Sequence, residues 1–268
     1  MELIQVFNNF LDQSNPNLQS ESFKMLEEIL NKPETIQQFI NILANREIPQ
    51  NIRQTVSVFM SEVIRRHCNI YIENTSIFLN DLLNAMLNEE DVYISSNIAF
   101  ALFPIYQGYG ENLQEMVNFI DQMCTSENLN AVRTGSIFLI EFLPTTNNVY
   151  LQSKHQIIIP LLKQLLSSYS PDIQYGFELF AAVQAKNDTN PQADAEYAQI
   201  FQQMLLFYQQ SLQEKNNLVG PLSQHIAISV ERETLFDSTV NLYNTFIQIA
   251  SNGNIHPENR IMPLFIIT

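Results

Sequence analysis

Apolar side chains recur every three to four residues along most of the chain, with polar side chains between them. This spacing places the apolar residues on one face of an α-helix, whereas a half-buried β-strand would need strict alternation. The helix-breaking sequence Asn15-Pro16-Asn17 separates the first two stretches of this kind. Their apolar positions are Leu3, Val6, Phe7, Phe10 and Leu11, followed by Phe23, Leu26, Ile29 and Leu30.

Signals for the beginning or end of a helix then recur about every twenty residues. They fall at Pro33, Pro49, Glu89, Gly110, Glu127, Pro144, Pro171 and Pro191. The polar stretch from Lys186 to Asp194 interrupts this rhythm, and we expect it to form a longer surface loop. The chain as a whole is predicted to be a string of helical hairpins.

Four of the predicted helices have matching sequences at a constant spacing. They open at residues 52, 92, 132 and 173, so that the steps between them are 40, 40 and 41 residues. A fixed period of this length is typical of HEAT and armadillo repeats, in which each hairpin buries its apolar face against its neighbours. We therefore predict an all-α fold, a right-handed α-solenoid of about six HEAT-type hairpins with a short first repeat, over residues 1–268 as one domain.

The register within these four helices supports a common structure. The fourth position of each is small, and the seventh is apolar. Glycine inside a helix costs roughly 1 kcal/mol relative to alanine, so its use here predicts a close contact with a neighbouring helix. The alternative is a chance coincidence of small residues. The small residues are Thr55, Ser95, Gly135 and Gly176, and the apolar ones are Val58, Ile98, Phe138 and Leu179.

The same helices share a polar edge, formed by positions four residues apart that lie on one helical face. In a two-helix solenoid the second helices line the concave side, so this edge is predicted to be an inner surface that binds a partner. The alternative is a solvated face with no partner. The candidate binding residues are Arg53, Tyr93, Asn97, Arg133, Glu141, Gln174 and Glu178.

Charge narrows the class of partner. The formal net charge is −15, which argues against nucleic acid as the primary partner because nucleic-acid binding needs a basic surface. Nine acidic residues and no Lys or Arg lie between Arg66 and Arg133, with a block at Glu89, Glu90 and Asp91. This field favours a basic partner protein. The alternative is that acidity only keeps the chain soluble.

No pattern of catalytic or metal-binding residues is present in the sequence. The four histidines have no two-histidine zinc spacing, and His67-Cys68 is better read as a helix end than as a site. We therefore expect no enzyme activity and no cofactor. Cys68 and Cys124 lie far apart and fit a reducing compartment, and no apolar stretch reaches the ~20 residues of a membrane span.

One segment resembles a known family. It reads Ile52-Arg53-Gln54, then Val58-Phe59-Met60, then Ile64-Arg65-Arg66, with three residues between the groups. This segment is similar to the second helix of the amino-terminal region of importin-β nuclear transport receptors. The later segments, 91–106, 129–143 and 171–183, resemble further HEAT repeats of the same kind.

The resemblance implies binding of the GTPase Ran in its GTP form, of basic cargo proteins and of Phe-Gly nucleoporins, in the cytoplasm and nucleus. The apolar residues 261–267 lead us to expect an array that is truncated at its C-terminal end. The alternative function is a HEAT or armadillo scaffold, such as a regulatory subunit of a phosphatase or ubiquitin-ligase complex.

Overall fold

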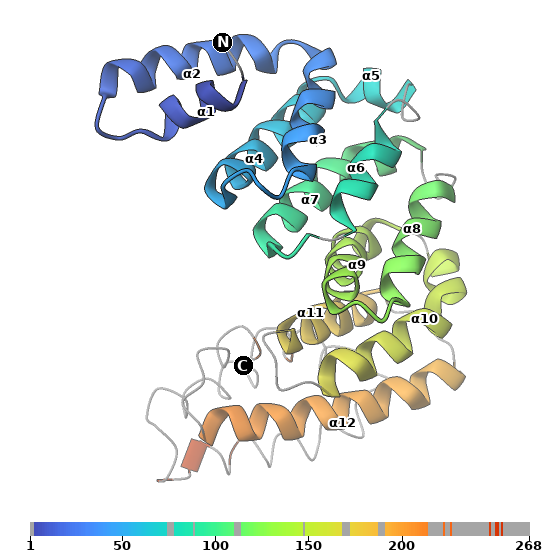
Figure 1. Cartoon of the computed structure of the whole chain (residues 1–268). Helices are drawn as coiled ribbons and strands as arrows, with labels where there is room; N and C mark the ends of the chain where they lie inside the picture. Colours follow the sequence, from blue (N-terminus) through green and yellow to red (C-terminus); the bar gives the residue numbers. More distant parts are fainter. Residues whose placement is uncertain are drawn as a thin grey trace. The chain divides into compact units, whose positions relative to one another are not determined.

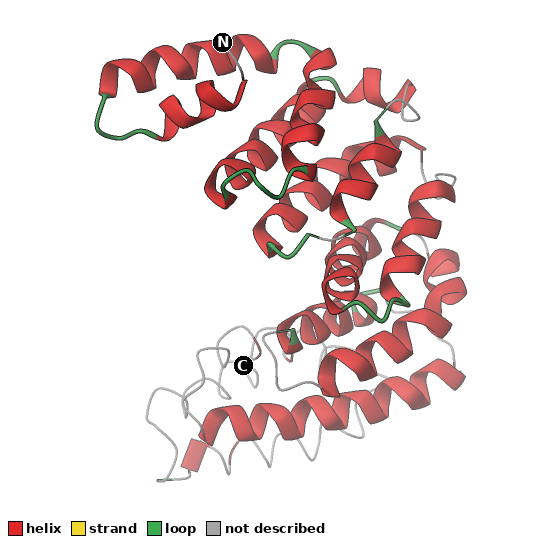
Figure 2. Ribbon diagram, in the orientation of Figure 1, coloured by secondary structure: helices red, strands yellow, loops and turns green. Residues whose placement is uncertain are grey.

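The computed structural model describes residues 3–73, 78–87, 89–109, 114–146, 148–167, 172–186 and 191–213, and positions 222, 226, 247, 250, 251 and 253. In these residues the regular structure is helical, with no β-strand, as predicted (Figure 2). The chain divides into two compact units, Met1–Glu141 and Phe142–Thr268. The expectation that both belong to one continuous domain stays a prediction.

The first unit consists of helical hairpins. α1 packs against α2, and α3 packs against α4 (Figure 1). The next hairpin repeats this layout, because α6 contacts α3 while α7 contacts α4. Each layer is therefore built from corresponding helices of successive repeats. The helices are α1 (Leu3–Leu11), α2 (Pro16–Leu30), α3 (Ile36–Ala44), α4 (Gln50–Arg66), α5 (Cys68–Glu73), α6 (Leu79–Met86), α7 (Val92–Tyr109), α8 (Gln114–Cys124) and α9 (Leu129–Phe142), with a 3₁₀ turn η1 at Pro33–Thr35.

Polar contacts between repeats confirm the predicted period. The Asn97 amide donates to the Ser57 hydroxyl 40 residues away, and the Ser95 and Thr134 hydroxyls meet across 39 residues. The step from the start of α2 at residue 16 to the start of α4 at residue 50 is 34 residues, against 42 from α4 to α7, which starts at residue 92. The first repeat is short, as the sequence predicts.

Local sequence signals determine where these helices begin. The Asn15 side chain accepts a hydrogen bond of 3.2 Å from the Leu18 amide, and Pro16 occupies the first turn of α2, where its missing N–H is not needed. Asp91 caps α7, because its Oδ1 accepts from the amides of Tyr93 (2.9 Å) and Ile94 (3.3 Å). Both caps lie at breaks that the apolar pattern marks.

The close contacts predicted from small residues are present at the two glycines. A β-carbon added to Gly135 would lie 2.8 Å from the Cys124 sulfur and 3.0 Å from the Cys124 amide nitrogen, so α8 and α9 touch there. A β-carbon at Gly176 would lie 3.0 Å from a terminal carbon of Leu166. Ser95 is also buried.

The register prediction is wrong at the first of the four helices. Thr55 is only partly buried, and its hydroxyl donates to the Asn51 carbonyl of its own helix. Val58 is 41% exposed, whereas Ile98, Phe138 and Leu179 are fully buried as predicted. The reason is that Val58 faces a surface groove rather than the interior of the repeat.

The second unit is also helical in the residues described. It contains η4 (Leu143–Thr145), α10 (Asn148–Ser167), α11 (Ile173–Gln184) and α12 (Pro191–Gln213), and α10 packs against both α11 and α12. The rings of Phe180 and Phe201 stack at 5.8 Å in its core. The loop expected from Lys186 to Asp194 is wrong at its C-terminal end, because Pro191 begins α12 and proline is tolerated in the first turn of a helix. Positions 187–190 of that expected loop lie outside the described residues.

Candidate binding groove of the first unit

An apolar groove lies among α2, α4 and α7 in the first unit. Its volume is about 490 Å³. We call it the α2–α4–α7 groove. Three large apolar side chains that line it are exposed to solvent: Phe23 from α2 (46%), Val58 from α4 and Phe100 from α7 (62%). An exposed cluster of this kind marks an interaction site more often than isolated surface hydrophobics do.

The sequence of α7 accounts for one wall of the groove. Its 18 residues, Val92–Tyr109, include no Asp, Glu, Lys or Arg. A helix that is apolar on most of its circumference cannot bury every side against its own neighbours. Ile98 and Leu102 are buried, and Phe100 is left at the surface. Pro104, inside the same helix, has no N–H to donate to the Phe100 carbonyl, which therefore lacks its regular helical donor.

An aromatic cluster holds the floor of the groove in place. The ring of Phe59 lies 5.5 Å from Phe7 and 5.7 Å from Phe10, in edge-to-face geometry with both. Phe10 in turn stacks on Phe23 at 6.1 Å, and Phe7 meets Phe39 at 6.0 Å. Aromatic pairs of this geometry add about 0.5–1.5 kcal/mol each beyond area burial. Rings from α1, α2, α3 and α4 thus make the groove a preformed surface.

Polar contacts fix α7 against α4 beside the groove. The Ser61 hydroxyl donates to the Asn97 carbonyl at 2.7 Å, while the Asn97 amide donates to the Ser57 hydroxyl at 3.0 Å. Ser57 itself is fully buried and donates to the Gln54 carbonyl. Asn97, one of the predicted binding residues, therefore lines the groove and also joins the two repeats.

A charged cluster borders the groove at the C-terminal end of α4. Glu62 accepts two hydrogen bonds from Arg65, of 2.9 and 2.8 Å, and one of 2.7 Å from Arg66. Arg66 also lies 3.7 Å from Glu27 on α2. Burial raises the pKa of Glu62, but the hydrogen bonds from Arg66 and Arg65 outweigh it, so the net pKa lies below its ordinary value. Glu62 is ionised at neutral pH.

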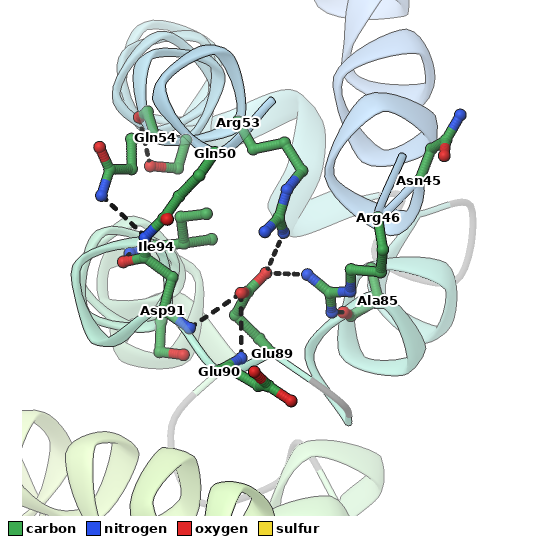
Figure 3. Close-up of polar contacts among 12 residues, drawn as sticks. Asn45, Arg46, Gln50, Arg53, Gln54, Ala85, Glu89, Glu90, Asp91 and Ile94 are labelled. Carbon is green, nitrogen blue, oxygen red and sulfur yellow. Dashed lines mark hydrogen bonds and ion pairs between the residues drawn. The ribbon is translucent and has the colours of Figure 1, made fainter. Parts of the chain in front are cut away.

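Arg53 is not on the exposed edge where the sequence placed it. It is 8% exposed, and its guanidinium donates to the Glu89 carboxylate at 2.7 Å (Figure 3). Arg46 from the α3–α4 turn binds the same carboxylate oxygen and also donates to the Ala85 carbonyl at 2.8 Å. The sequence could not show this pairing, because the three charged residues lie on segments that only folding brings together.

The acidic block also needs correction. Glu89 is buried, and its second oxygen accepts from the amides of Glu90 (3.0 Å) and Asp91 (2.9 Å). Asp91 accepts from Gln50 and Gln54 of α4 at 2.5 and 2.7 Å. Burial raises the pKa of Asp91, but the hydrogen bonds that it accepts lower that pKa by more. Only Glu90 of the three is exposed. The acidic block therefore serves mainly to join neighbouring repeats, and only Glu90 contributes an exposed negative charge.

The other predicted residues are not brought into the groove. Tyr93 is on α7 and 54% exposed, but it lies outside the groove lining. Arg133 and Glu141 are partly exposed on α9. Gln174 and Glu178 belong to the second unit, where the Gln174 amide donates to the Glu178 carboxylate at 2.7 Å. The prediction that these residues bind a partner stays a prediction.

Sequence reasoning missed the groove residues Phe23, Val58 and Phe100. Phe23 and Val58 sit at positions where the helical period predicts burial. The sequence signal that could have indicated the groove was the uncharged segment that forms α7. It contains more apolar side chains than one buried face of a helix can hold. An apolar residue beyond that face has to remain at the surface, as Phe100 does.

No group of three or more His, Cys, Asp or Glu that could hold a metal ion occurs among the described residues. His67 ends α4 as predicted, and its Nε2 lies 3.1 Å from the Leu30 carbonyl. Burial raises the pKa of the neighbouring Cys68 thiol. In the described part of the chain, no helix is both long enough and apolar enough for a transmembrane span.

The architecture follows from the packing of corresponding helices in successive hairpins, α3 against α6 and α4 against α7. The chain is a helical-repeat protein. No known family profile matches it, and no curated protein matches it. Similar solved structures include a designed armadillo repeat protein in complex with the peptide (KR)4, at 16% identity and TM-score 0.45, over 88% of this chain and 100% of that one. An engineered protein is 11% identical, with TM-score 0.48, over 100% and 99% of the two chains. Another designed armadillo repeat protein is 15% identical, with TM-score 0.40, over 87% and 100%.

Proposed function

We propose that this chain is a protein-binding helical-repeat module that docks an apolar segment of a partner in the α2–α4–α7 groove. The observation that carries the proposal is the exposure of Phe23, Val58 and Phe100 around one preformed groove. Covering a large apolar side chain yields about 1.5–3 kcal/mol. Because the aromatic cluster already fixes the floor, little of that gain is lost in ordering the site.

Binding rather than catalysis fits the chemistry of this groove. Its polar groups are engaged in holding the structure: Asn97 and Ser61 link α4 to α7, and Glu62 is paired with two arginines. A catalytic site would need a nucleophile or general base positioned for a substrate. We therefore propose no reaction and no cofactor for this chain.

Replacing Phe100 with Ala is expected to weaken binding of peptides selected against this chain. Random 16-residue peptides displayed on phage supply the probe, and Kd is measured by fluorescence anisotropy on the purified full chain. Loss of one well-packed aromatic contact should raise Kd about ten- to hundredfold. Leu129→Ala is the matched control, because Leu129 is as exposed as Phe100 but lies outside the groove.

Two outcomes would count against the proposed docking site. One is that no peptide is enriched by the wild-type chain. The other is that the enriched peptides bind the Phe100→Ala and Leu129→Ala variants equally well. Unchanged circular dichroism of both variants would show that any loss of affinity is local.

A more specific function is favoured by the resemblance of Ile52–Arg66 to importin-β receptors. We propose that the chain is the amino-terminal part of a nuclear transport receptor, active in the cytoplasm and nucleus, that binds Ran-GTP, basic cargo and Phe-Gly nucleoporins. Of the residues that the resemblance places on the inner face, Tyr93 is exposed on α7 and lies outside the groove lining. It is the residue through which a partner on that face is best tested.

A pull-down with Ran locked in its GTP or GDP form tests this role. The transport proposal expects capture of the GTP form alone, weakened by Tyr93→Ala. If neither form is captured while groove-binding peptides are, the chain is a HEAT or armadillo scaffold of another kind, and the transport role is wrong.

A further inference from the structure

We infer that the occupant of the α2–α4–α7 groove is an amphipathic helix of a partner protein, carrying a carboxylate that pairs with Arg65. This inference rests on the proposed function and specifies the chemistry of its ligand. Three features carry it: the absence of a strand edge among the described residues beside the groove, the different roles of two arginines, and the charge at the groove mouth.

The backbone around the groove favours a helical ligand. All three walls are helices, whose interior N–H and C=O groups are already paired except for the Phe100 carbonyl opposite Pro104, and the described residues contain no β-strand that an extended peptide could join. An extended segment would therefore leave its own backbone groups without partners in the groove. A helix satisfies them internally and presents apolar side chains three and four residues apart.

The two arginines at the mouth of the groove differ in their role. Arg66 is held from three directions, by Glu62 at 2.7 Å, by the Asn31 side chain at 3.3 Å and by Glu27 at 3.7 Å. It links α4 to α2 and is thus part of the groove's construction. Among the described residues Arg65 binds Glu62 alone, and its side chain is 67% exposed.

Arg65 can turn to a ligand without leaving a charge unpaired. Glu62 keeps the hydrogen bond from Arg66 when Arg65 moves away, so its carboxylate stays neutralised. The exposed pair between Arg65 and Glu62 contributes little, since such pairs are worth only a fraction of their contact energy in water. Arg65 is therefore the available guanidinium, and a guanidinium binds a carboxylate through two parallel hydrogen bonds.

The local charge at the groove mouth differs from the net charge of the whole unit, because the lining carries two Arg and two Glu. Residues 1–141 contain seven Lys or Arg and eighteen Asp or Glu, a net charge of −11, which attracts basic partners over long distances. Around the groove, however, α7 is uncharged, and the lining carries two carboxylates, Glu27 and Glu62, that both lie against Arg66. Arg65 has the most exposed side chain of the four charged residues on the lining, 67% against 49% for Glu27. A lysine placed there would meet the guanidinium, whereas a carboxylate would complement it.

The test is a selection of displayed 16-residue peptides with fixed apolar positions at helical spacing and randomised flanking positions. The baits are the full wild-type chain, Arg65→Glu and Lys24→Glu. Lys24 is exposed on α2 outside the groove lining, so its replacement gives the same change of charge as Arg65→Glu. We expect Asp or Glu to be enriched at one flanking position with the wild-type and Lys24→Glu baits, and Lys or Arg there with Arg65→Glu.

For a selected peptide, changing its acidic residue to Gln should raise Kd about three- to tenfold on the wild-type chain and not on Arg65→Gln. The inference is overturned if all three baits enrich the same charge, including a basic residue paired with Glu27, or if the selected peptides are not helical by circular dichroism when bound. If no selected peptide binds the Phe100→Ala variant more weakly than the wild-type chain, the proposed function itself fails. This result differs from one in which binding is weakened by Phe100→Ala but unchanged by substitution of Arg65, which overturns only the present inference.

Discussion

Replacing Glu89 with Ala should lower the free energy of unfolding of the first unit by about 3–5 kcal/mol, the range for removal of one partner from a buried ion pair. The carboxylate is 1% exposed and receives guanidinium groups from Arg46 and Arg53 as well as two backbone amides. Its removal leaves two arginines facing each other, and Arg53 is buried. Urea denaturation of the full chain, followed by circular dichroism, measures the loss.

Glu90→Ala is the matched control, because Glu90 is the adjacent residue of the same type and is exposed. Its effect should be close to zero. Arg53→Ala should fall between the two, since Glu89 then keeps Arg46 as a partner. Equal stability of the Glu89→Ala and Glu90→Ala variants would show that the cluster does not hold the second and third repeats together.

The second large effect is expected at Gly135. Changing it to Leu should lower the free energy of unfolding by about 1–3 kcal/mol, because the added side chain must displace the Cys124 sulfur and the backbone of α8. The Ala variant should also destabilise, since the backbone nitrogen of Cys124 at 3.0 Å cannot easily move away. Thermal unfolding of the purified variants gives the comparison.

Gly176→Ala is the natural reference for this substitution. There the nearest atom is a terminal carbon of Leu166, which can turn aside, and the gain in helix propensity of about 1 kcal/mol opposes the crowding. We expect Gly176→Ala to be close to neutral. If Gly135→Ala were as stable as Gly176→Ala, the contact between α8 and α9 would be looser than the distances indicate.

The helical repeats could be predicted from the sequence because they depend on local signals. The repeat spacing predicts helices that open at residues 52, 92, 132 and 173, and α4, α7, α9 and α11 begin within three residues of them. Gly135 correctly indicates the close approach of two helices, because glycine destabilises the interior of a helix unless a neighbour needs the space of its missing side chain. Such features are encoded within one helix or one period.

The binding surface was harder to predict, because it depends on which residues meet after folding. Arg53 and Glu89 are 36 residues apart, so nothing in either local sequence shows that they pair. Val58 occupies an apolar position of the repeat, but it lines the α2–α4–α7 groove. From their acidity alone, Glu89, Glu90 and Asp91 would be replaced together with neutral residues to test their effect on the rate of association with a partner. Because Glu89 and Asp91 hold the repeats together, this triple substitution would destabilise the fold before it changed that rate.

Asp91 connects the start of α7, the second helix of its repeat, to α4, the second helix of the repeat before it. One carboxylate oxygen holds the first amides of α7, and the other receives the side-chain amides of Gln50 and Gln54 from α4. The nucleation of α7 is therefore favoured when α4 is already formed, which lowers the cost of the first helical turn. In a chain built from quasi-independent hairpins, this residue provides nearest-neighbour cooperativity, so that the third repeat should rarely be folded while the second is not.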